Sequence, residues 1–135
     1  MVDYKRSIIP DRASIIKLYD DVGWTAYTKD EERLYRAINN SLDLLTAWDN
    51  NNLVGLLRTV GDSETIIYIQ DILVLREYQG NRIGKKLINK IMQEYQDVRQ
   101  KVLLTDSTEK TESFYQKVGF EPVEEYDMKA FIKID

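Results

Sequence analysis

A short loop with two glycines joins an apolar stretch to an amphipathic stretch near the middle of the chain. Its residues are Gln79, Gly80, Asn81, Arg82, Ile83 and Gly84. Glycine lets the backbone approach a ligand closely, and the first turn of a helix presents backbone N–H groups that have no acceptor within the helix. The helix dipole adds a partial positive charge at the same place. The loop therefore predicts an anion site that suits a pyrophosphate group.

Three phosphate-loop patterns compete for this segment, and two of them fail on its residues. No Gly-Lys pair is followed by Ser or Thr, which excludes the mononucleotide P-loop. Gly80 and Gly84 are too far apart for the dinucleotide pattern GxGxxG. The segment instead resembles the acyl-CoA pyrophosphate loop of the GCN5-related N-acetyltransferases (GNAT), which reads Gln or Arg, two residues, Gly, one residue, then Gly or Ala. Arg82 stands where that family most often has its central glycine.

A second motif follows in the order that the same family shows. In GNAT proteins the pyrophosphate helix precedes a strand and then a helix with a Phe-Tyr pair that ends in Gly-Phe. This chain has Phe114 and Tyr115, followed by Gly119 and Phe120. The two motifs together carry the resemblance, which is clearest over residues 53–120.

The resemblance implies an α+β fold of three layers, the GNAT acyl-CoA N-acyltransferase fold, in which helices flank a mixed, mostly antiparallel sheet. Length predicts a single domain over residues 1–135. Gly23-Trp24 and residues 71–74 are similar to the small aralkylamine (serotonin-type) branch of the family. Periodicity predicts helices at 10–22, 30–39, 83–95 and 106–119, and strands at 3–8, 42–48, 53–60, 65–75, 101–105, 121–126 and 128–134.

Tyr115 is the candidate general acid. Its counterpart in the family commonly lies beside the CoA sulfur, so the resemblance implies that Tyr115 protonates the departing thiolate. A phenol with a pKa of about 10 keeps its proton at neutral pH and can pass it to a thiolate of pKa about 8.5. The alternative is that Tyr115 packs beside Phe114 as part of the core.

Asp71 is the candidate general base. It is the only carboxylate in an otherwise apolar strand, where burial would raise its pKa toward a useful range. It could equally hold a loop by hydrogen bonding, and the family often deprotonates its amine through ordered water. The resemblance implies that acetyl-CoA contacts a further set of residues, which comprises Leu73, Val74, Leu75, Gln79, Gly80, Asn81, Arg82, Ile83, Gly84, Lys85 and Tyr115.

The amine acceptor is expected to meet aromatic side chains. In the family, the segment after the first helix and the last hairpin border the acceptor channel, which implicates Trp24, Tyr27 and Tyr126 together with Asp71. Trp24 and Tyr27 could form an apolar wall on which a cation rests. The alternative for Trp24 is that it fills the gap after the first helix.

Composition excludes several other kinds of site. Cysteine and histidine are absent, so we expect no disulfide, no thiolate metal site and no cysteine nucleophile, and the commonest general base is missing. The net charge of −4 argues against nucleic acid as a partner. No apolar run is long enough to span a bilayer, and the start does not read as a signal peptide. We therefore expect a cytoplasmic protein without a membrane or nucleic-acid partner.

Two functional hypotheses follow from the resemblance. The first is an acetyl-CoA-dependent N-acetyltransferase whose acceptor, a small-molecule or peptide amine, attacks directly in a ternary complex. The second is a non-catalytic acyl-CoA-binding regulatory module. The presence of Tyr115 and Asp71 favours the enzyme, since a sensor needs no proton donor at the sulfur. Many relatives form homodimers, and the sequence does not decide oligomeric state.

Overall fold

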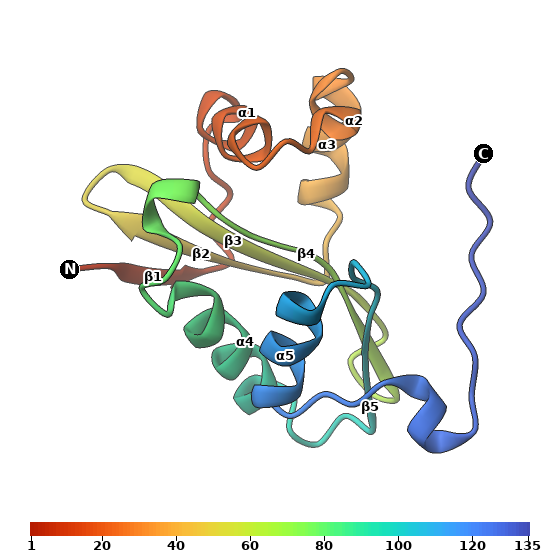
Figure 1. Cartoon of the computed structure of the whole chain (residues 1–135). Helices are drawn as coiled ribbons and strands as arrows, with labels where there is room; N and C mark the ends of the chain where they lie inside the picture. The colour runs from red at the N-terminus through yellow and green to blue at the C-terminus, as the bar shows by residue number, and fades with distance from the viewer. The chain divides into compact units, whose positions relative to one another are not determined.

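In the computed structural model, which describes residues 1–135, one sheet contains all the strands (Figure 1). Its order is β1-β2-β3-β4-β5, which is also the order along the chain. The first four strands pair antiparallel, and β5 runs parallel to β4. The expected mixed, mostly antiparallel sheet is confirmed. The strands are β1 (Asp3–Arg6), β2 (Asp43–Asp49), β3 (Asn52–Gly61), β4 (Ile66–Val74) and β5 (Gln100–Leu103).

Helices cover both faces of this sheet. On one face lie α1 (Arg12–Asp21), α2 (Thr25–Thr28) and α3 (Glu31–Asn39), and on the other lies α4 (Ile83–Glu94) (Figure 1). The short α2 was not predicted from the sequence. No helix is long and apolar enough to cross a bilayer. Contacts divide the chain into two units, Met1–Leu104 and Thr105–Asp135, and the sheet with these four helices belongs to the first.

Close packing of α4 against β3 depends on Gly55. A Cβ added at Gly55 would lie 3.1 Å from Ile83 Cγ2, which is closer than side chains normally approach, and 3.4 Å from Leu87 Cδ1, at the limit of ordinary contact. Gly55 pairs directly with Val74 at the end of β4, and paired residues share a face of the sheet. The first turn of α4 is thereby held close to the end of β4.

A β-bulge interrupts the pairing of β3 with β4. Arg58 pairs with Asp71 and Thr59 with Ile69, so Gln70 is the extra residue on β4. On its other side, β4 pairs with β5 only over Ile66–Ile69. Residues 70–74 of β4 therefore have no neighbouring strand on the β5 side within the first unit.

The second unit contains α5 (Glu109–Lys117) and the 3₁₀ turn η2 (Val123–Tyr126). Thr108 caps the start of α5 by accepting a hydrogen bond from Thr111 N, 3.2 Å away. Gly119 has φ +102°, and Phe120 N donates to Tyr115 O, so the predicted glycine end of the helix is confirmed.

The two predicted strands at 121–126 and 128–134 are wrong for this structure. The first is replaced by η2, which follows Pro122, and the second has no regular structure. Asp127 is left-handed (φ +56°), and Met128 N turns back to Val123 O. Alternating apolar residues make a segment capable of forming a strand, but its backbone hydrogen bonds must come from a neighbouring strand, which this unit lacks.

Candidate functional site

The predicted anion site lies between β4 and α4, which are joined through a short 3₁₀ turn, η1 (Arg76–Tyr78). Arg82 precedes the first helical residue and has a left-handed backbone, with φ +64° and ψ +16°. That conformation is costly for a residue with a side chain, which explains why glycine suits this position. The first helical bond runs from Lys86 N to Arg82 O. The N–H groups of residues 83–85 therefore precede the hydrogen-bonded part of α4 and can bind an anion.

Polar side chains of the loop hold its backbone in place. Gln79 Nε2 donates to Val74 O at 3.0 Å, and Asn81 Nδ2 donates to Tyr78 O at 3.2 Å. Tyr78 OH donates to Asp49 Oδ2 at 2.5 Å, and this hydrogen bond raises the pKa of Tyr78. Gln79 and Asn81 were both predicted to contact acetyl-CoA. Their side chains instead donate hydrogen bonds to backbone carbonyls and hold the loop conformation. Their backbones remain able to face a ligand.

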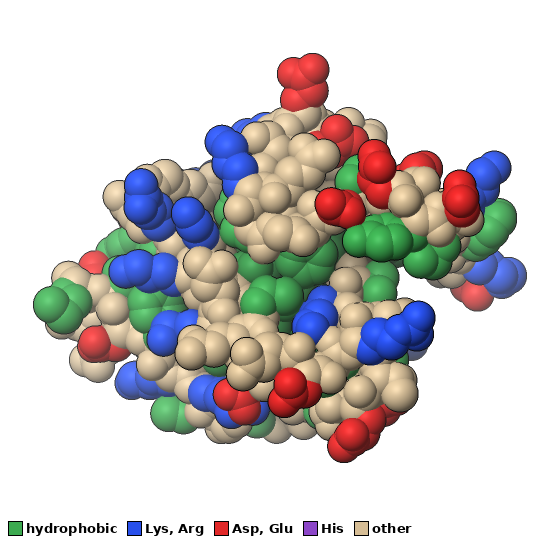
Figure 2. Space-filling model, turned by 90° about the horizontal axis from the view of Figure 1, so that it is seen from below, with side chains coloured by type: hydrophobic (Ala, Val, Ile, Leu, Met, Phe, Trp, Pro, Cys, Tyr) green, Lys and Arg blue, Asp and Glu red, His purple; other side chains and the backbone are tan.

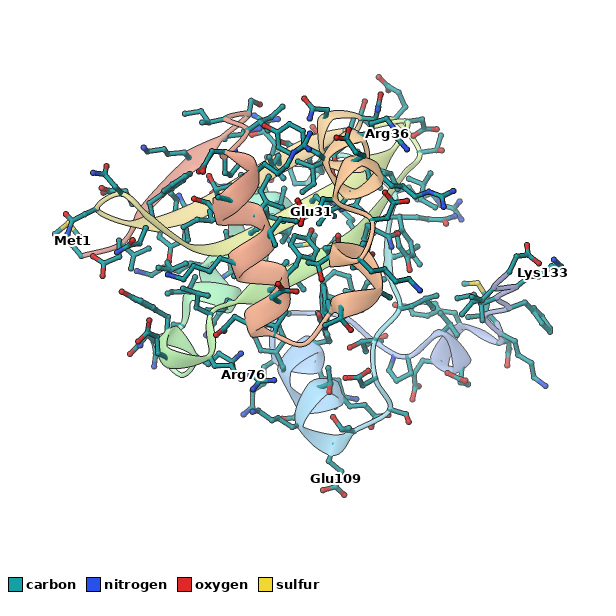
Figure 3. The ribbon with its side chains drawn as sticks, turned by 90° about the horizontal axis from the view of Figure 1, so that it is seen from above. Met1, Glu31, Arg36, Arg76, Glu109 and Lys133 are labelled. Carbon is teal, nitrogen blue, oxygen red and sulfur yellow. The ribbon has the colours of Figure 1, made fainter.

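Basic side chains gather around this loop. Several Lys and Arg side chains gather at the left of Figure 2, on the side where Figure 1 places α4. The exposed cations of this stretch are Arg76, Arg82, Lys85, Lys86 and Lys90. Arg76 lies beside the end of α1, as Figure 3 shows, and its backbone N donates to Asp21 Oδ2 at 2.7 Å. The charge therefore favours an anionic ligand at the loop.

Asp71 lies on the α1 face of the sheet at the centre of a buried side-chain cluster. Only 2% of the residue is exposed. Arg58 Nε donates to its Oδ2 at 2.5 Å, Tyr19 OH donates to Oδ2 at 2.8 Å, and Tyr27 OH donates to Oδ1 at 2.8 Å. Three hydrogen-bond donors therefore converge on the two oxygens of the Asp71 carboxylate. These contacts are the ones that the holding role of Asp71 predicts, and its role in the reaction stays a prediction.

Aromatic rings pack around this cluster. The ring centroids of Tyr19 and Tyr27 are 5.3 Å apart, and those of Trp24 and Tyr27 are 6.2 Å apart. The Arg58 guanidinium lies 6.0 Å from the centre of the Tyr27 ring. Burial, and then the charge of Asp71, raise the pKa of Tyr19. The predicted acceptor residues Trp24, Tyr27 and Asp71 are therefore close together. The positive charge beside them belongs to the guanidinium of Arg58.

Gln70 joins this group, although sequence reasoning gave it no role. Its Nε2 donates to Tyr27 OH at 3.1 Å, and its side chain is exposed at the bulge. Tyr27 OH is thus held between Gln70 and Asp71. The only sequence signal was a second polar residue beside Asp71 in an apolar strand, and the bulge that orients Gln70 depends on strand register.

Tyr115 and Tyr126 belong to the second unit. The Tyr115 ring packs edge-on against Phe114, 5.0 Å between centroids, and against Phe120, 6.0 Å. Burial raises the pKa of Tyr115 and a hydrogen bond with Thr105 lowers it, with a net increase. Tyr115 is therefore a protonated phenol at neutral pH. Tyr126 is exposed, and a hydrogen bond with Glu121 raises its pKa.

Comparisons with known proteins agree on one family. Residues 16–134 match the family model described as Acetyltransferase (GNAT) domain. The protein named Uncharacterized N-acetyltransferase ycf52-like, from Prochlorococcus marinus, is 28% identical over 116 residues, which cover 82% of this chain and 62% of that protein. The chain spans about three fifths of the length of the first curated relatives it matches.

Solved structures show the same fold. The acetyltransferase of the GNAT family SP0256 from Streptococcus pneumoniae TIGR4 superposes with a TM-score of 0.89 at 35% identity, over 100% of this chain and 98% of that chain. AAC(6')-Iy, in complex with the bisubstrate analogue CoA-S-monomethyl-acetylneamine, superposes with a TM-score of 0.68 at 16% identity, over 100% and 98%. At that identity the second likeness concerns the fold alone.

Proposed function

Because the chain belongs to the GNAT acetyltransferase family, we propose that it is an acetyl-CoA-dependent N-acetyltransferase with one catalytic domain over residues 1–135. The observation that carries this proposal is the loop of residues 79–84, whose left-handed Arg82 opens α4 next to the unpaired part of β4. A neighbour of the same fold, AAC(6')-Iy, has been solved with a CoA-containing analogue.

The loop and the open edge of β4 suit the two ends of acetyl-CoA. Backbone N–H groups at the start of α4, with the cations of Arg82 and Lys85, would bind the pyrophosphate. Residues 70–74 of β4 lack a neighbour on the β5 side, so their backbone can pair with an extended ligand as another strand would. Leu73, Val74 and Leu75 lie along this edge and its continuation. The backbone N–H of Leu73 or Val74 would stabilise the thioester oxyanion, since Leu75 N already donates to Val54 O.

In the proposed reaction, the neutral amine attacks the thioester carbonyl, the C–S bond breaks, and the CoA thiolate leaves. Tyr115 donates its phenolic proton to that thiolate. The amine loses its extra proton to water, since three donors occupy Asp71. Trp24, Tyr27 and Tyr126 would contact the acceptor, while Asp71 positions Tyr27 rather than reacting.

The first experiment is the release of free CoA from acetyl-CoA across a panel of amines. The panel contains arylalkylamines, polyamines, aminoglycosides and peptide N-termini. Release with one class would establish the reaction and identify the acceptor class. Tight acetyl-CoA binding without release across the panel would favour the non-catalytic acyl-CoA-binding module.

Tyr115→Phe tests the general acid. We expect turnover to fall by about 10²- to 10⁴-fold, because proton transfer to the thiolate is lost, while acetyl-CoA affinity changes little. Tyr4→Phe removes the same hydroxyl from a tyrosine outside the proposed site and should leave turnover unchanged. Since the pKa of Tyr115 is raised, the native rate should not fall through ionisation of this acid until the pH exceeds about 10. Full activity in Tyr115→Phe would show that another group is the acid.

A further inference from the structure

Gln70 lies at the bulge of β4, beside the edge that β5 leaves open. β4 pairs with β5 only as far as Ile69, so Gln70 is the first residue of the unpaired stretch. It is also the only exposed residue of β4, since Ile69 and Asp71 on either side of it are buried. A ligand bound along this edge can therefore reach the polar side chain of Gln70.

The bulge directs Gln70 and Asp71 to the same neighbour. Side chains of consecutive strand residues normally point to opposite faces of a sheet. Here Gln70 Nε2 donates to Tyr27 OH at 3.1 Å, and Tyr27 OH donates to Asp71 Oδ1 at 2.8 Å. The extra residue of the bulge thus breaks the alternation and turns Gln70 toward the segment that is expected to meet the acceptor.

These hydrogen bonds determine which way round the Gln70 amide lies. Asp71 forms an ion pair with Arg58, and a carboxylate in an ion pair only accepts hydrogen bonds. Tyr27 therefore gives its single proton to Asp71, and its oxygen can only accept from a second partner. Burial raises the pKa of Tyr27, so the phenol keeps that proton at neutral pH. Gln70 must then turn its NH₂ group to Tyr27, which directs Oε1 away from that ring.

The carbonyl oxygen of Gln70 is available to a ligand. The only side-chain hydrogen bond of this residue is the one that its Nε2 donates. An exposed carbonyl oxygen binds water, and the N–H group of a ligand can replace that water. A neutral amide, unlike a carboxylate, does not favour the protonated form of an amine through charge. Oε1 is therefore suited to an unprotonated amine, which is the form that attacks a thioester.

We propose that Gln70 is a catalytic residue whose Oε1 accepts a hydrogen bond from the attacking amine nitrogen. Tyr27, held by Asp71, is the positioning residue that fixes the amide. This inference rests on the proposed acetyl transfer. The contact would hold the nitrogen at the stretch of β4 where the N–H of Leu73 or Val74 is expected to bind the thioester oxygen. It would also stabilise the positive charge that develops on nitrogen as the C–N bond forms.

Gln70→Leu tests the contact, with the amine that releases most CoA in the panel as the acceptor. We expect kcat to fall about 10- to 100-fold, because a hydrogen bond to a developing charge is lost, while the KM for acetyl-CoA changes little. Gln93→Leu makes the same change at an exposed glutamine of α4 and should leave kcat unchanged. If the native chain transfers acetyl groups and Gln70→Leu keeps the native kcat, this inference fails and the proposed function stands. If the native chain releases CoA with no amine, both fail.

Tyr27→Phe separates positioning from contact. Phenylalanine keeps the ring that is expected to touch the acceptor and removes the hydroxyl that fixes the amide, so kcat should fall less than in Gln70→Leu. The double variant Gln70→Leu/Tyr27→Phe should have the kcat of Gln70→Leu alone, because the Tyr27 hydroxyl acts through Gln70. Losses that multiply in the double variant would show that the two residues act independently, and would overturn the positioning role.

Gln70→Glu examines the same contact through the pH profile. A carboxylate beside the bound amine favours the ammonium form and raises the pKa of the amine. Because the unprotonated amine reacts, kcat increases with pH through that pKa, and the midpoint should move to higher pH by about one pH unit. The neighbouring ionisable groups, Asp71, Arg58 and Tyr27, are the same in both proteins, and Gln93→Glu should keep the native midpoint. An unchanged midpoint in Gln70→Glu would show that residue 70 does not contact the nitrogen, and would overturn the proposal.

Discussion

The loop before α4 and the Asp71 cluster are both candidate parts of one site, yet they are built in opposite ways. The loop is local, and its ligand groups are mainly backbone N–H groups, with Gln79 and Asn81 supporting the backbone. The cluster is made of side chains from distant parts of the chain, since Tyr19 and Tyr27 lie 52 and 44 positions from Asp71. A change in the loop should therefore affect ligand binding, and a change in the cluster should first affect folding.

The largest expected effect is on stability, at Asp71. Asp71→Asn removes the charge that pairs with Arg58, which is 6% exposed, and leaves a buried guanidinium without its carboxylate. We expect a loss of about 3–5 kcal/mol in the free energy of unfolding, because breaking one side of a buried ion pair leaves an uncompensated charge. Urea unfolding with an unchanged m value measures this.

An exposed ion pair provides the matched control for that change. Arg12 Nη1 contacts Glu32 Oε1 at 2.9 Å, with both side chains largely in solvent. Glu32→Gln makes the same acid-to-amide change and should cost less than about 1 kcal/mol. Acetyl transfer per folded molecule should survive Asp71→Asn. If Asp71→Asn cost no more than Glu32→Gln and yet abolished transfer, Asp71 would be the general base and the comparison between loop and cluster would fail.

The fold was largely predictable because its elements show local periodicity. The strands and helices of residues 1–104 were expected within a few positions, apart from the four-residue α2 and the 3₁₀ turn η1. The loop was predictable for the same reason, since all of its parts lie within six consecutive residues. The strands expected at 121–126 and 128–134 were wrong, because alternation describes the side chains while strand formation needs a backbone partner.

The Asp71 cluster shows where sequence reasoning reached its limit. Residue type and burial identified Asp71, but its three donors come from α1, α2 and β3, and only tertiary packing brings them together. Gln70 was missed because its orientation depends on a bulge. A one-residue change of register would send each side chain of the strand to the other face.

The second effect concerns binding, at the loop. Gly84→Glu places bulk and negative charge in the first turn of α4, where the pyrophosphate is expected. Acetyl-CoA affinity should fall at least about 100-fold through like-charge repulsion and steric exclusion, as calorimetric titration would show. The free energy of unfolding should change little, because an acidic residue suits a helix N-terminus.

A control substitution elsewhere on α4 tests whether the position of the added charge, rather than the net charge of the protein, determines acetyl-CoA affinity. Asn89→Glu adds the same charge to the exposed side of α4, farther from its start. Its acetyl-CoA affinity should stay within about threefold of native, because exposed charges more than roughly 10 Å apart are largely screened in salt. Equal losses in both variants would mean that net charge controls binding, and unchanged affinity in Gly84→Glu would refute the pyrophosphate assignment.

The smallest effect is expected at Arg82. One substitution there should change stability and ligand affinity in opposite directions. Arg82→Gly relieves a left-handed backbone and should raise the free energy of unfolding by about 0.5–1 kcal/mol. The loss of the guanidinium should at the same time weaken acetyl-CoA binding and reduce its dependence on salt, because fewer cations then contact the phosphates.

Ser7→Gly is the matched control. It relieves a similar left-handed backbone (φ +63°) just after β1 and should give the stability gain without the loss of affinity. If Arg82→Gly gained stability and kept native affinity, the loop would bind its ligand through backbone alone. If it lost stability, the Arg82 side chain would be holding the loop, and the contrast with the Asp71 cluster would be smaller than the geometry indicates.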